Sequence, residues 1–375
     1  MVYYVGYYNC DEIRGEERLV APPSENKMNY ITTALAERSG NQVQVVTLAE
    51  TAKCRWVKGK NTPICQGVNL KTFASFNSKN KLLRGLGHLL TKGLAFTYLL
   101  THLKKEDHLV VYHSLFVMKM VRRLKRLKQC TLTLEVEELY SDVTGDEAKR
   151  QQEIDYLQIA DRYIFITPLL RDVVNTKKPS VISFGTYQPI PDLGFRFEDG
   201  KIHVVYAGVL SRVKGGAFTA ISAARYLDDG YVLEILGKGS PKEEEEVRRA
   251  IDEVAPQTTC KINFVGYKSG DDFNAYIQAC HIGLSTQQAD AKFNATSFPS
   301  KVLMYLSNGL RVVSVKIPAV TTSVVDDYMV YYDCQDGEQV ADAIRSGALN
   351  DGFEPRAFLQ DLHGEFVTQL SDLLQ

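Results

Sequence analysis

The chain has 375 residues, enough for two or three domains of ordinary size, and 45% of them are hydrophobic against 24% charged. This balance excludes a disordered, collagenous or disulfide-dense protein. The 44 Lys and Arg nearly cancel the 45 Asp and Glu, which leaves a formal net charge of -1. Without a global positive field to hold a polyanion, we expect no binding of nucleic acid.

The cysteines and apolar runs indicate the compartment. Seven cysteines are scattered along the chain without a CxxC pair, which favours reduced thiols over a zinc site or a redox couple. The first residues show no charged segment followed by an apolar one, and no apolar run reaches the roughly 18 residues that span a bilayer. We therefore expect a cytoplasmic protein.

Short β-rich apolar runs alternate with amphipathic stretches from the first residue, which is typical of βα units on a parallel sheet. In the first half of the chain, strands are predicted at 2–7, 44–48, 108–112, 130–134, 163–166 and 180–183. Helices are predicted between them, at 26–39, 79–104, 117–127, 146–160 and 169–175.

Residues 187–200 interrupt this pattern with two prolines, two glycines and three acids, a composition typical of a linker. A second series of strands is predicted beyond it, at 203–207, 231–236, 261–265, 282–285 and 311–315. Its helices are predicted at 217–227, 242–254, 271–279, 299–307 and in a pair beyond Glu338. The chain should therefore contain two similar α/β domains with a ligand cleft between them.

Two cations follow the first strand of the second series. Arg212 and Lys214 stand in a loop that begins at Gly208 and leads into a helix. The free N–H groups at a helix N-terminus already favour a phosphate, and the two side chains would add charge-assisted hydrogen bonds. The alternative is that both cations are simply solvated, and their spacing alone does not decide between the two interpretations.

A second candidate anion site is the start of a short helix near residue 300. Ser297 is a plausible N-cap, Pro299 a first-turn residue and Gly309 a C-cap. A phosphate at this end would gain the free N–H groups, the Ser300 hydroxyl and the Lys301 charge together. The same segment is also an ordinary capped core helix, which does not conflict with anion binding at its tip.

Further candidates follow other predicted strands. Gly237 and the segment ending in Tyr267 follow two predicted strands at the carboxyl edge of the second sheet. Glycines at such positions let the backbone turn tightly or approach a ligand closely. In the first half, His113 follows one strand and Glu135 ends another, where either could serve as a base or bind sugar hydroxyls. The alternatives are a satisfied structural histidine and a solvated acidic turn.

Taken together, these features resemble the donor half of GT-B glycosyltransferases, in particular the retaining family 4 type within the group 1 glycosyl transferases. The resemblance is carried by Gly208, Arg212, Lys214, Gly237, Gly239, Phe264-Val-Gly266 and a Ser-Lys helix that ends in Tyr305-Leu-Ser-Asn-Gly309-Leu-Arg-Val-Val. In the first half, 160–167 is similar to that family's strand into the last helix of the acceptor domain, and 182–186 to its Asn-Gly turn.

The resemblance implies an α/β protein of the GT-B fold, with two Rossmann-like domains that face each other across a cleft. The expected parts are an acceptor-binding domain at 1–187, a linker at 188–200, a donor-binding domain at 201–353 and a C-terminal helix at 354–375 that packs back on the first domain.

The resemblance also implies a glycosyltransferase that moves a hexose from a nucleoside diphosphate sugar, here a UDP-sugar, to a hydroxyl of a glycan or lipid-linked saccharide in surface polysaccharide synthesis. It implies retention of configuration and no metal or other cofactor, because Arg212 and Lys214 would stabilise the departing diphosphate. The catalytic set would be His113, Glu135, Arg212 and Lys214. The nucleotide would be held by Gly208, Arg212, Lys214, Gly237, Tyr267, Ser297, Ser300 and Lys301.

The chain departs from the family at two positions. The family carries two glutamates eight residues apart, the second of which contacts the ribose, and the matching positions here are Thr296 and Met304. A methionine cannot replace a carboxylate as acceptor for a ribose hydroxyl. Two alternatives therefore stay open: an inactive GT-B binding or partner subunit, and a nucleotide-sugar epimerase on the same fold.

A basic cluster in the first half suggests a membrane partner. It consists of Lys119, Arg122, Arg123, Lys125, Arg126 and Lys128, and it follows an apolar, basic-flanked helix at 79–104. Such a patch suits anionic lipid headgroups, at about 1 kcal/mol for each charge near the surface. The alternative is a solvated helix face; the first predicts a peripheral protein on the inner face of the membrane, the second a soluble one.

Overall fold

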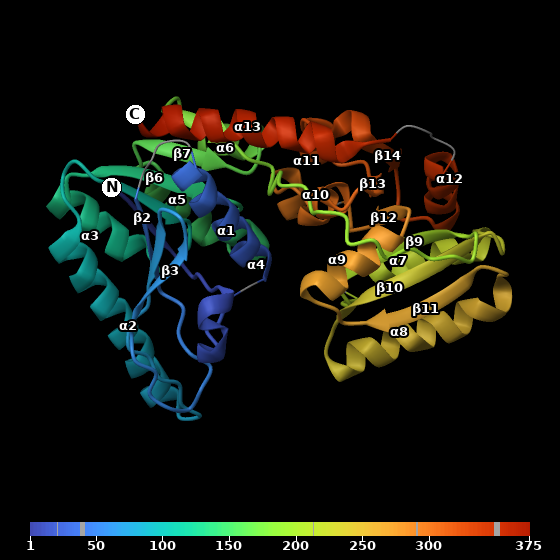
Figure 1. Cartoon of the computed structure of the whole chain (residues 1–375), viewed down its shortest axis with the longest axis horizontal. Coiled ribbons are helices and arrows are strands. Elements are labelled where there is room, and N and C mark those ends of the chain that lie inside the picture. The colour runs from blue at the N-terminus through green and yellow to red at the C-terminus, as the bar shows by residue number, and fades with distance from the viewer. Residues whose placement is uncertain (21, 38–41, 213, 290–291, 349–352) are drawn as a thin grey trace. The chain divides into compact units, whose positions relative to one another are not determined.

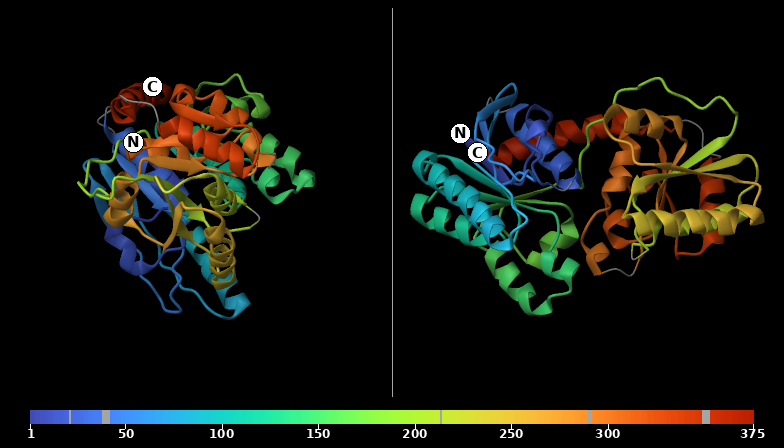
Figure 2. Two further views of the ribbon diagram at one scale, coloured as in Figure 1. Left: turned by 90° about the vertical axis from the view of Figure 1, so that its right-hand side faces the viewer. Right: turned by 90° about the horizontal axis from the view of Figure 1, so that it is seen from below.

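The computed structural model describes residues 1–20, 22–37, 42–212, 214–289, 292–348 and 353–375. They form two compact units: unit 1 contains Met1–Thr186 and Gly364–Gln375, and unit 2 contains Tyr187–His363. Each unit has one sheet with helices on both of its faces (Figure 1, Figure 2). The predicted α/β fold class with two largely parallel sheets is confirmed.

The sheet of unit 1 has the strand order β3-β4-β2-β1-β5-β6-β7-β8. The β3–β4 pair is antiparallel, and the other pairs are parallel. The bounds are β1 Val2–Gly6, β2 Val43–Thr47, β3 Asn61–Cys65, β4 Val68–Lys71, β5 His108–Tyr112, β6 Thr131–Val136, β7 Arg162–Phe165 and β8 Ser180–Ile182. The helices are α1 Pro22–Glu37, α2 Lys81–His102, α3 Met118–Lys128, α4 Tyr140–Thr144, α5 Glu147–Leu157 and α6 Pro168–Val174.

The central strands of unit 1 form where the sequence places short apolar runs. All residues of β1 and nearly all of β6 are buried, as expected for parallel strands covered on both faces. Polar caps fix the start of two helices: the Asn80 side chain accepts hydrogen bonds from the first N–H groups of α2, and Thr167 does the same for α6.

The sheet of unit 2 is parallel, with the order β11-β10-β9-β12-β13-β14. The strands are β9 Ile202–Val209, β10 Tyr231–Lys238, β11 Lys261–Gly266, β12 Ile282–Ser285, β13 Arg311–Val315 and β14 Met329–Tyr332. The helices are α7 Gly216–Ala223, α8 Pro241–Val254, α9 Gly270–Ala279, α10 Ser300–Ser307, α11 Pro318–Thr321 and α12 Gly337–Ala348. Helix α8 begins with a capping box between Ser240 and Glu243.

The segment predicted as a linker is fastened to unit 2. It contains no helix or strand, but the Ile190 N–H donates to the Ser307 carbonyl at 2.9 Å. The Gln278 side chain accepts from the Leu193 N–H and donates to the Pro191 carbonyl. The segment thus runs along unit 2 with its backbone polar groups partly satisfied.

The last helix, α13 (Pro355–Leu374), contributes to both units. In unit 2 the Arg356 guanidinium donates to the carbonyl of Asn308 at 2.9 Å. In unit 1 the Phe366 ring stacks on Tyr30, with 5.6 Å between ring centroids. Only the part from Gly364 groups with unit 1, whereas the sequence places the whole of 354–375 against the first domain.

Each strand and helix predicted from the sequence has a counterpart, although residues 38 and 39 of the helix predicted at 26–39 lie outside the described residues. The sequence analysis omits three strands, β3, β4 and β14, and the short helices α4 and α11. The β3–β4 hairpin has little apolar character, since β3 alternates between exposed and half-buried residues and contains Pro63. Its two strands are joined by a turn in which Gly67 has a φ of 83°.

Candidate anion site

The strand order of unit 2 reverses between β9 and β12. The chain runs from β9 through β10 to β11 on one side, and from β12 through β13 to β14 on the other. In open parallel sheets, ligands bind beyond the carboxyl ends of the strands at this reversal point. The loops after β9 and β12 meet here, because the Thr286 hydroxyl donates to the Gly216 carbonyl at 2.7 Å.

The loop after β9 requires glycine at two positions. Gly215 precedes α7 with a φ of 69°, in the left-handed region. A Cβ at Gly216 would lie 2.7 Å from the Tyr206 ring, so the helix can begin this close to the strand only without a side chain. The N-terminus of α7 is thereby placed at the carboxyl edge of the sheet.

Lys301, in the first turn of α10, reaches the same edge. Its Nζ lies 4.0 Å from the centroid of the Tyr206 ring, a favourable position for a cation. A Cβ at Gly208 would lie 2.7 Å from this Nζ. The lysine therefore lies against the end of β9, although the sequence separates the two by 93 residues (301 − 208).

Lys301 lies near another cation and has no nearby carboxylate, within the described part of the chain, to balance its charge. Burial and, second, the positive charge of Lys214 lower the pKa of Lys301 to about 7. Neither lysine forms an ion pair with a carboxylate of the described residues. Two cations brought together in this way are stabilised by an anion and destabilised without one.

The start of α10 differs from the prediction. Ser297 is not the N-cap: the helix begins at Ser300, and the residue before it is Pro299, in extended conformation with φ -69° and ψ 110°. Pro299, and not Ser297, therefore precedes the first helical turn, and it has no side-chain oxygen that could cap the helix. The Ser297 Oγ is buried and has no hydrogen-bond partner among the described residues, while Ser300 is exposed.

Tyr305 fixes α10 to the sheet, a role that the sequence analysis does not assign. Its hydroxyl accepts the Ala207 N–H at 2.8 Å and donates to the Leu284 carbonyl at 3.4 Å. A Cβ at Gly283 would lie 2.2 Å from the ring. A buried tyrosine on an amphipathic helix gives no sequence signal for such a bridge between β9 and β12.

Arg212 points elsewhere in this structure. Its guanidinium lies over the Phe218 ring at 4.6 Å and 3.6 Å from the Glu246 carboxylate of α8, and the side chain is largely exposed. The structure therefore brings together Lys214 and Lys301, but not Arg212 with them. Val213, between the two cations, lies outside the described residues.

Gly237 lies at the same edge and Tyr267 beside it. A Cβ at Gly237 would lie 1.9 Å from the Gly208 carbonyl oxygen, so the ends of β9 and β10 approach closely only because this residue is glycine. The Tyr267 ring is 65% exposed, with the Lys238 Nζ 5.7 Å from its centroid. Met304 is half-buried, and the structure gives its side chain no polar role.

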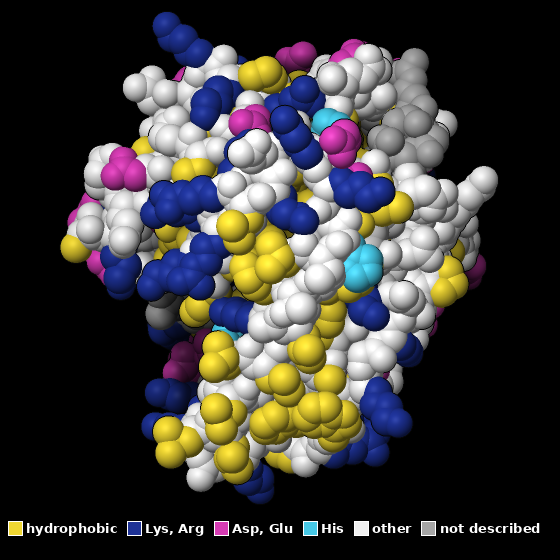
Figure 3. Space-filling model, turned by 90° about the vertical axis from the view of Figure 1, so that its left-hand side faces the viewer, with side chains coloured by type: hydrophobic (Ala, Val, Ile, Leu, Met, Phe, Trp, Pro, Cys, Tyr) yellow, Lys and Arg dark blue, Asp and Glu magenta, His cyan; other side chains and the backbone are white. Residues whose placement is uncertain are grey.

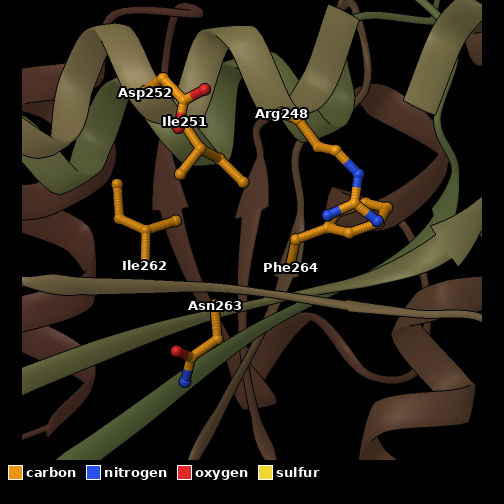
Figure 4. Close-up of a pocket in the computed structure, with 6 residues that line it drawn as sticks. All are labelled: Arg248, Ile251, Asp252, Ile262, Asn263 and Phe264. Atoms are coloured by element: carbon orange, nitrogen blue, oxygen red, sulfur yellow. The ribbon is translucent and has the colours of Figure 1, made fainter. Parts of the chain in front are cut away.

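A pocket between α8 and β11 lies away from this edge (Figure 4). It is lined by Arg248, Ile251, Asp252, Ile262, Asn263 and Phe264. The Arg248 guanidinium covers the Phe264 ring at 4.0 Å, so the charge is used within the protein. None of the predicted site residues lines this pocket.

In unit 1 the strand order reverses between β1 and β5, and His113 directly follows β5. The side chain is buried, and its Nε2 lies 2.7 Å from the Glu153 carboxylate. Glu153 also accepts the N–H groups of Tyr140 and Ser141 at 2.9 Å. Burial alone would raise the pKa of Glu153, but the hydrogen bonds from His113 and Ser141 hold it below its ordinary value.

Glu135 lies inside unit 1 beside a second carboxylate. Its Oε2 accepts the Tyr4 hydroxyl at 2.6 Å, and no part of the side chain is exposed. Burial and the negative charge of Glu137 raise the pKa of Glu135 to about 8. Lys27 balances the pair, with its Nζ 3.6 Å from Glu137 and donating to the Ser183 carbonyl at 2.6 Å.

Neither Lys27 nor Glu153 is identified by the sequence analysis. Both are buried charged residues on helices, at positions where a helical pattern would place a solvated side chain. In the part of the chain that the structure describes, no three His, Cys, Asp or Glu side chains come together to hold a metal ion.

Comparison with known proteins agrees with this geometry. Residues 201–349 match the family model described as Glycosyl transferases group 1. No curated protein sequence matches the chain.

Solved structures of similar fold cover the whole chain. One is described as trehalose-6-phosphate from E. coli bound with UDP-2-fluoro glucose, with a TM-score of 0.66, 11% identity, and coverage of 100% of this chain and 99% of that one. Another is the alpha,alpha-trehalose-phosphate synthase (UDP-forming) from Burkholderia xenovorans in complex with glucose-6-phosphate, with TM-score 0.62, 11% identity, and coverage of 99% and 96%. The sucrose-phosphate synthase from Thermosynechococcus elongatus has TM-score 0.61 at 15% identity, with coverage of 100% and 94%. At these identities the likeness concerns the fold. Residues 201–349 therefore match the group 1 glycosyl transferases, and the chain as a whole has the GT-B fold.

Proposed function

We propose that the protein transfers a glycosyl group from a UDP-sugar to a hydroxyl of a saccharide acceptor, and that the diphosphate binds at the reversal point of unit 2. The observation that carries this proposal is Lys301, whose Nζ lies 4.0 Å from the Tyr206 ring at the end of β9 and has no carboxylate partner among the described residues, with Lys214 exposed in the loop after β9. The UDP-sugar in the similar E. coli structure supports the choice of donor.

The diphosphate would complete the charges and hydrogen bonds of this site. Lys301 would donate to it from α10, Lys214 from the loop after β9, and the N–H groups at the start of α7 would add their partial positive charge. The unpartnered Ser297 hydroxyl supplies a further donor. Since Gly208 and Gly237 carry no side chains, the ligand can approach the strand ends closely.

These groups would act on the leaving group of the reaction. When the bond between the anomeric carbon and the diphosphate breaks, negative charge grows on the diphosphate oxygens. Cations and N–H groups fixed beforehand around those oxygens stabilise the transition state more than the bound donor. In this scheme the lysines take the role that a metal ion has elsewhere, and independence of metal remains our prediction.

Unit 1 would bind the acceptor at the carboxyl edge of its own sheet, near His113. Of the two catalytic candidates there, Glu135 is fully enclosed, and its Oε2 accepts the Tyr4 hydroxyl. We assign Glu135 a positioning role through Tyr4 and keep His113 as the candidate that contacts substrate. The His113 ring is itself buried, but its Nδ1 has no hydrogen-bond partner among the residues described, so a substrate group could occupy that position.

Several finer expectations stay predictions. They concern retention of configuration, a lipid-linked or glycan acceptor, and a role in surface polysaccharide synthesis. A sugar phosphate is a further acceptor to test, because glucose-6-phosphate is present in one of the similar structures.

Calorimetry with UDP tests the donor site. Replacing a charge-assisted contact costs about 1.5–3 kcal/mol, so Lys301→Met should weaken UDP binding about 10- to 100-fold. Lys261→Met is the matched control, since this exposed lysine begins β11 at the opposite edge of the sheet and should leave affinity unchanged. Equal affinity of the Lys301→Met variant and the wild type would remove the diphosphate from this site.

Turnover separates transfer from the two alternative functions. UDP release from a UDP-sugar that requires an added saccharide acceptor supports the proposal. Conversion of the donor to its epimer without an acceptor would instead identify an epimerase. Tight UDP binding with no turnover on a broad acceptor panel would identify an inactive binding subunit.

A further inference from the structure

Helix α2 exposes an apolar surface that its own unit does not cover. Its buried residues, Gly87, Thr91, Ala95 and Leu99, form one stripe at intervals of four residues. Four leucines elsewhere on the helix are exposed by 80%, 48%, 57% and 67%: Leu82, Leu83, Leu86 and Leu89. A monomeric protein rarely leaves so many neighbouring leucines in water without a function for them.

Trp56 extends this surface beside the helix. Its ring is 56% exposed and stacks on Phe76, with 6.0 Å between centroids. Phe76 in turn lies directly under α2, because a Cβ at Gly87 would lie 2.5 Å from its carbonyl oxygen. Trp56 is thus held next to the helix. We refer to Trp56, Leu82, Leu83, Leu86 and Leu89 as the α2 face.

The residues around the α2 face carry charge of one sign. From residue 51 to residue 105 the chain contains no Asp or Glu, but it contains the cations Lys53, Arg55, Lys58, Lys60, Lys71, Lys79, Lys81, Arg84, Lys92, Lys104 and Lys105. Lys79, Lys81 and Arg84 are exposed and stand next to the leucines. Glu50, which contacts the helix, is largely buried and faces His88, and two of these cations, Lys53 and Lys60, form ion pairs with Glu17 and Glu16.

We propose that the α2 face docks on an anionic lipid bilayer. Figure 3 shows hydrophobic side chains gathered on this side of unit 1, with Lys and Arg side chains at their margin. Leucine and tryptophan side chains can enter the boundary between headgroups and acyl chains, while the lysines and arginines reach the anionic headgroups. No helix within the described residues is long and apolar enough to cross a membrane, so α2 would lie on the surface.

The charge pattern favours a bilayer over a second copy of the chain. A symmetric dimer through the α2 face would bring its cations against the same cations of the other copy. An anionic surface instead offers a partner of opposite sign to each of them, over an area wide enough for the whole face.

We place the membrane surface on the α2 face and not on the basic cluster predicted on α3. That helix exposes Arg122, Arg123 and Arg126, but its one largely exposed apolar side chain among the described residues is Leu127. Lys125 is occupied by Asp161 and the Cys130 carbonyl. Phe116 and Leu127, 72% and 63% exposed, stand near opposite ends of α3, whereas the α2 face groups four exposed leucines and a tryptophan beside its cations.

The single tryptophan of the chain provides the test, because Trp56 lies on the proposed surface. The full-length protein is titrated with vesicles of phosphatidylcholine alone and of phosphatidylcholine mixed with phosphatidylglycerol. Docking predicts a blue shift of the Trp56 emission and quenching by brominated acyl chains, both requiring phosphatidylglycerol and weakening as salt rises. The measurement needs no donor or acceptor, so its result is independent of the proposed glycosyl transfer.

Variants locate the surface. Leu82→Glu combined with Leu86→Glu should reduce vesicle binding by about tenfold or more, because it replaces two inserting side chains by anions. Val324→Glu is the matched control, since this valine is 47% exposed but belongs to unit 2. Changing Lys79, Lys81 and Arg84 to Gln should weaken binding more than changing Arg122, Arg123 and Arg126 to Gln. Far-ultraviolet circular dichroism confirms that each variant is folded.

Three results would overturn the inference. The first is an emission of Trp56 that does not change with phosphatidylglycerol vesicles at low salt. The second is equal binding to vesicles with and without phosphatidylglycerol, or greater sensitivity to the α3 changes. The third is self-association of the protein without lipid that Leu82→Glu abolishes, which would assign the α2 face to a second copy.

Discussion

The two reversal points of the molecule use charge in opposite ways. In unit 1, the buried carboxylate of Glu153 is matched by donors of the protein itself: the His113 ring and two backbone N–H groups. In unit 2, Lys214 and Lys301 lie close enough to repel each other and have no ion-pair partner within the described part of the chain. The Glu153 carboxylate has its partners without a ligand, whereas the two lysines lack an anion among the residues described.

This difference separates residues that serve the fold from residues that serve a ligand. A buried charge with a complete set of partners stabilises the folded chain, and its removal leaves those partners orphaned. A cation without a counter-charge costs stability, which a protein retains when binding or catalysis requires it. The same kind of substitution should therefore have opposite effects in the two units.

The largest expected effect is in unit 1. Glu153→Ala would leave the Tyr140 and Ser141 N–H groups and the His113 ring without their acceptor, and should lower the free energy of unfolding by about 3 kcal/mol. Urea denaturation followed by circular dichroism measures this. Glu106→Ala, at an exposed position, is the control and should change it by less than about 0.5 kcal/mol. A loss below about 1 kcal/mol for Glu153→Ala would show that the carboxylate is not the structural anchor described here.

The next effect is the pH dependence of UDP binding in unit 2. Without ligand the pKa of Lys301 is about 7, and a bound diphosphate would raise it by its negative charge. Binding above pH 7 then takes up a proton, so affinity should fall as pH rises from 7.5 to 9, by up to about tenfold per pH unit. Calorimetry in buffers of different ionisation enthalpy measures the proton uptake.

Lys301→Arg is the control for this pH dependence. An arginine stays protonated throughout the range, so its affinity for UDP should be nearly constant between pH 7.5 and 9. A wild-type affinity that is equally constant would contradict the assignment of Lys301 to the diphosphate.

A smaller effect is expected on the stability of unit 2. Lys301→Met keeps the length of the side chain and removes its charge, so the free energy of unfolding near pH 7 should stay the same or rise by up to about 1 kcal/mol. Because the folded-state pKa of Lys301 is lowered, its contribution makes the wild type more stable as pH rises above 7, and the variant should lack this gain. Clear destabilisation by Lys301→Met would indicate that the lysine serves the fold.

The sequence predicts the strands and loops of both regions but not the contacts between elements that are distant in the chain. The strands around both reversal points follow from apolar runs such as 108–112 and 282–285, and the loop of Arg212 and Lys214 follows from glycines beside cations. The meeting of Lys301 with Tyr206 does not follow, since it joins a helix and a strand distant in the chain. Neither does the cap of α10, where the extended Pro299 displaces Ser297 from the expected position.

Buried charges are the second limit of the sequence analysis. Glu153 stands in a helix in which seven of the eleven residues are charged or carry a side-chain amide, so the pattern alone favours a solvated side chain. Only the packing of α5 against the strand ends buries it beside His113. Likewise the basic residues of α3 and the leucines of α2 are both visible in the sequence, but the exposure that distinguishes them arises from how each helix packs on the sheet.

The last prediction concerns Glu135, the buried carboxylate of unit 1 whose pKa is raised to about 8. Because the ordinary value is 4.5, the folded protein binds a proton here that the unfolded chain releases between pH 4.5 and 8. Stability from this group is therefore full below about pH 4.5 and is lost as pH rises through 8.

Glu135→Gln imitates the protonated acid, so it should leave the free energy of unfolding nearly unchanged, within about 0.5 kcal/mol, at pH 5. Above pH 8 the variant should be the more stable of the two, because the wild type must then bury a second negative charge beside Glu137. Urea denaturation of both proteins from pH 5 to pH 9 measures the difference in free energy of unfolding. If the two free energies changed with pH in parallel, Glu135 would be ionised in the folded protein. Lys27 would then neutralise the pair more fully than the contacts indicate.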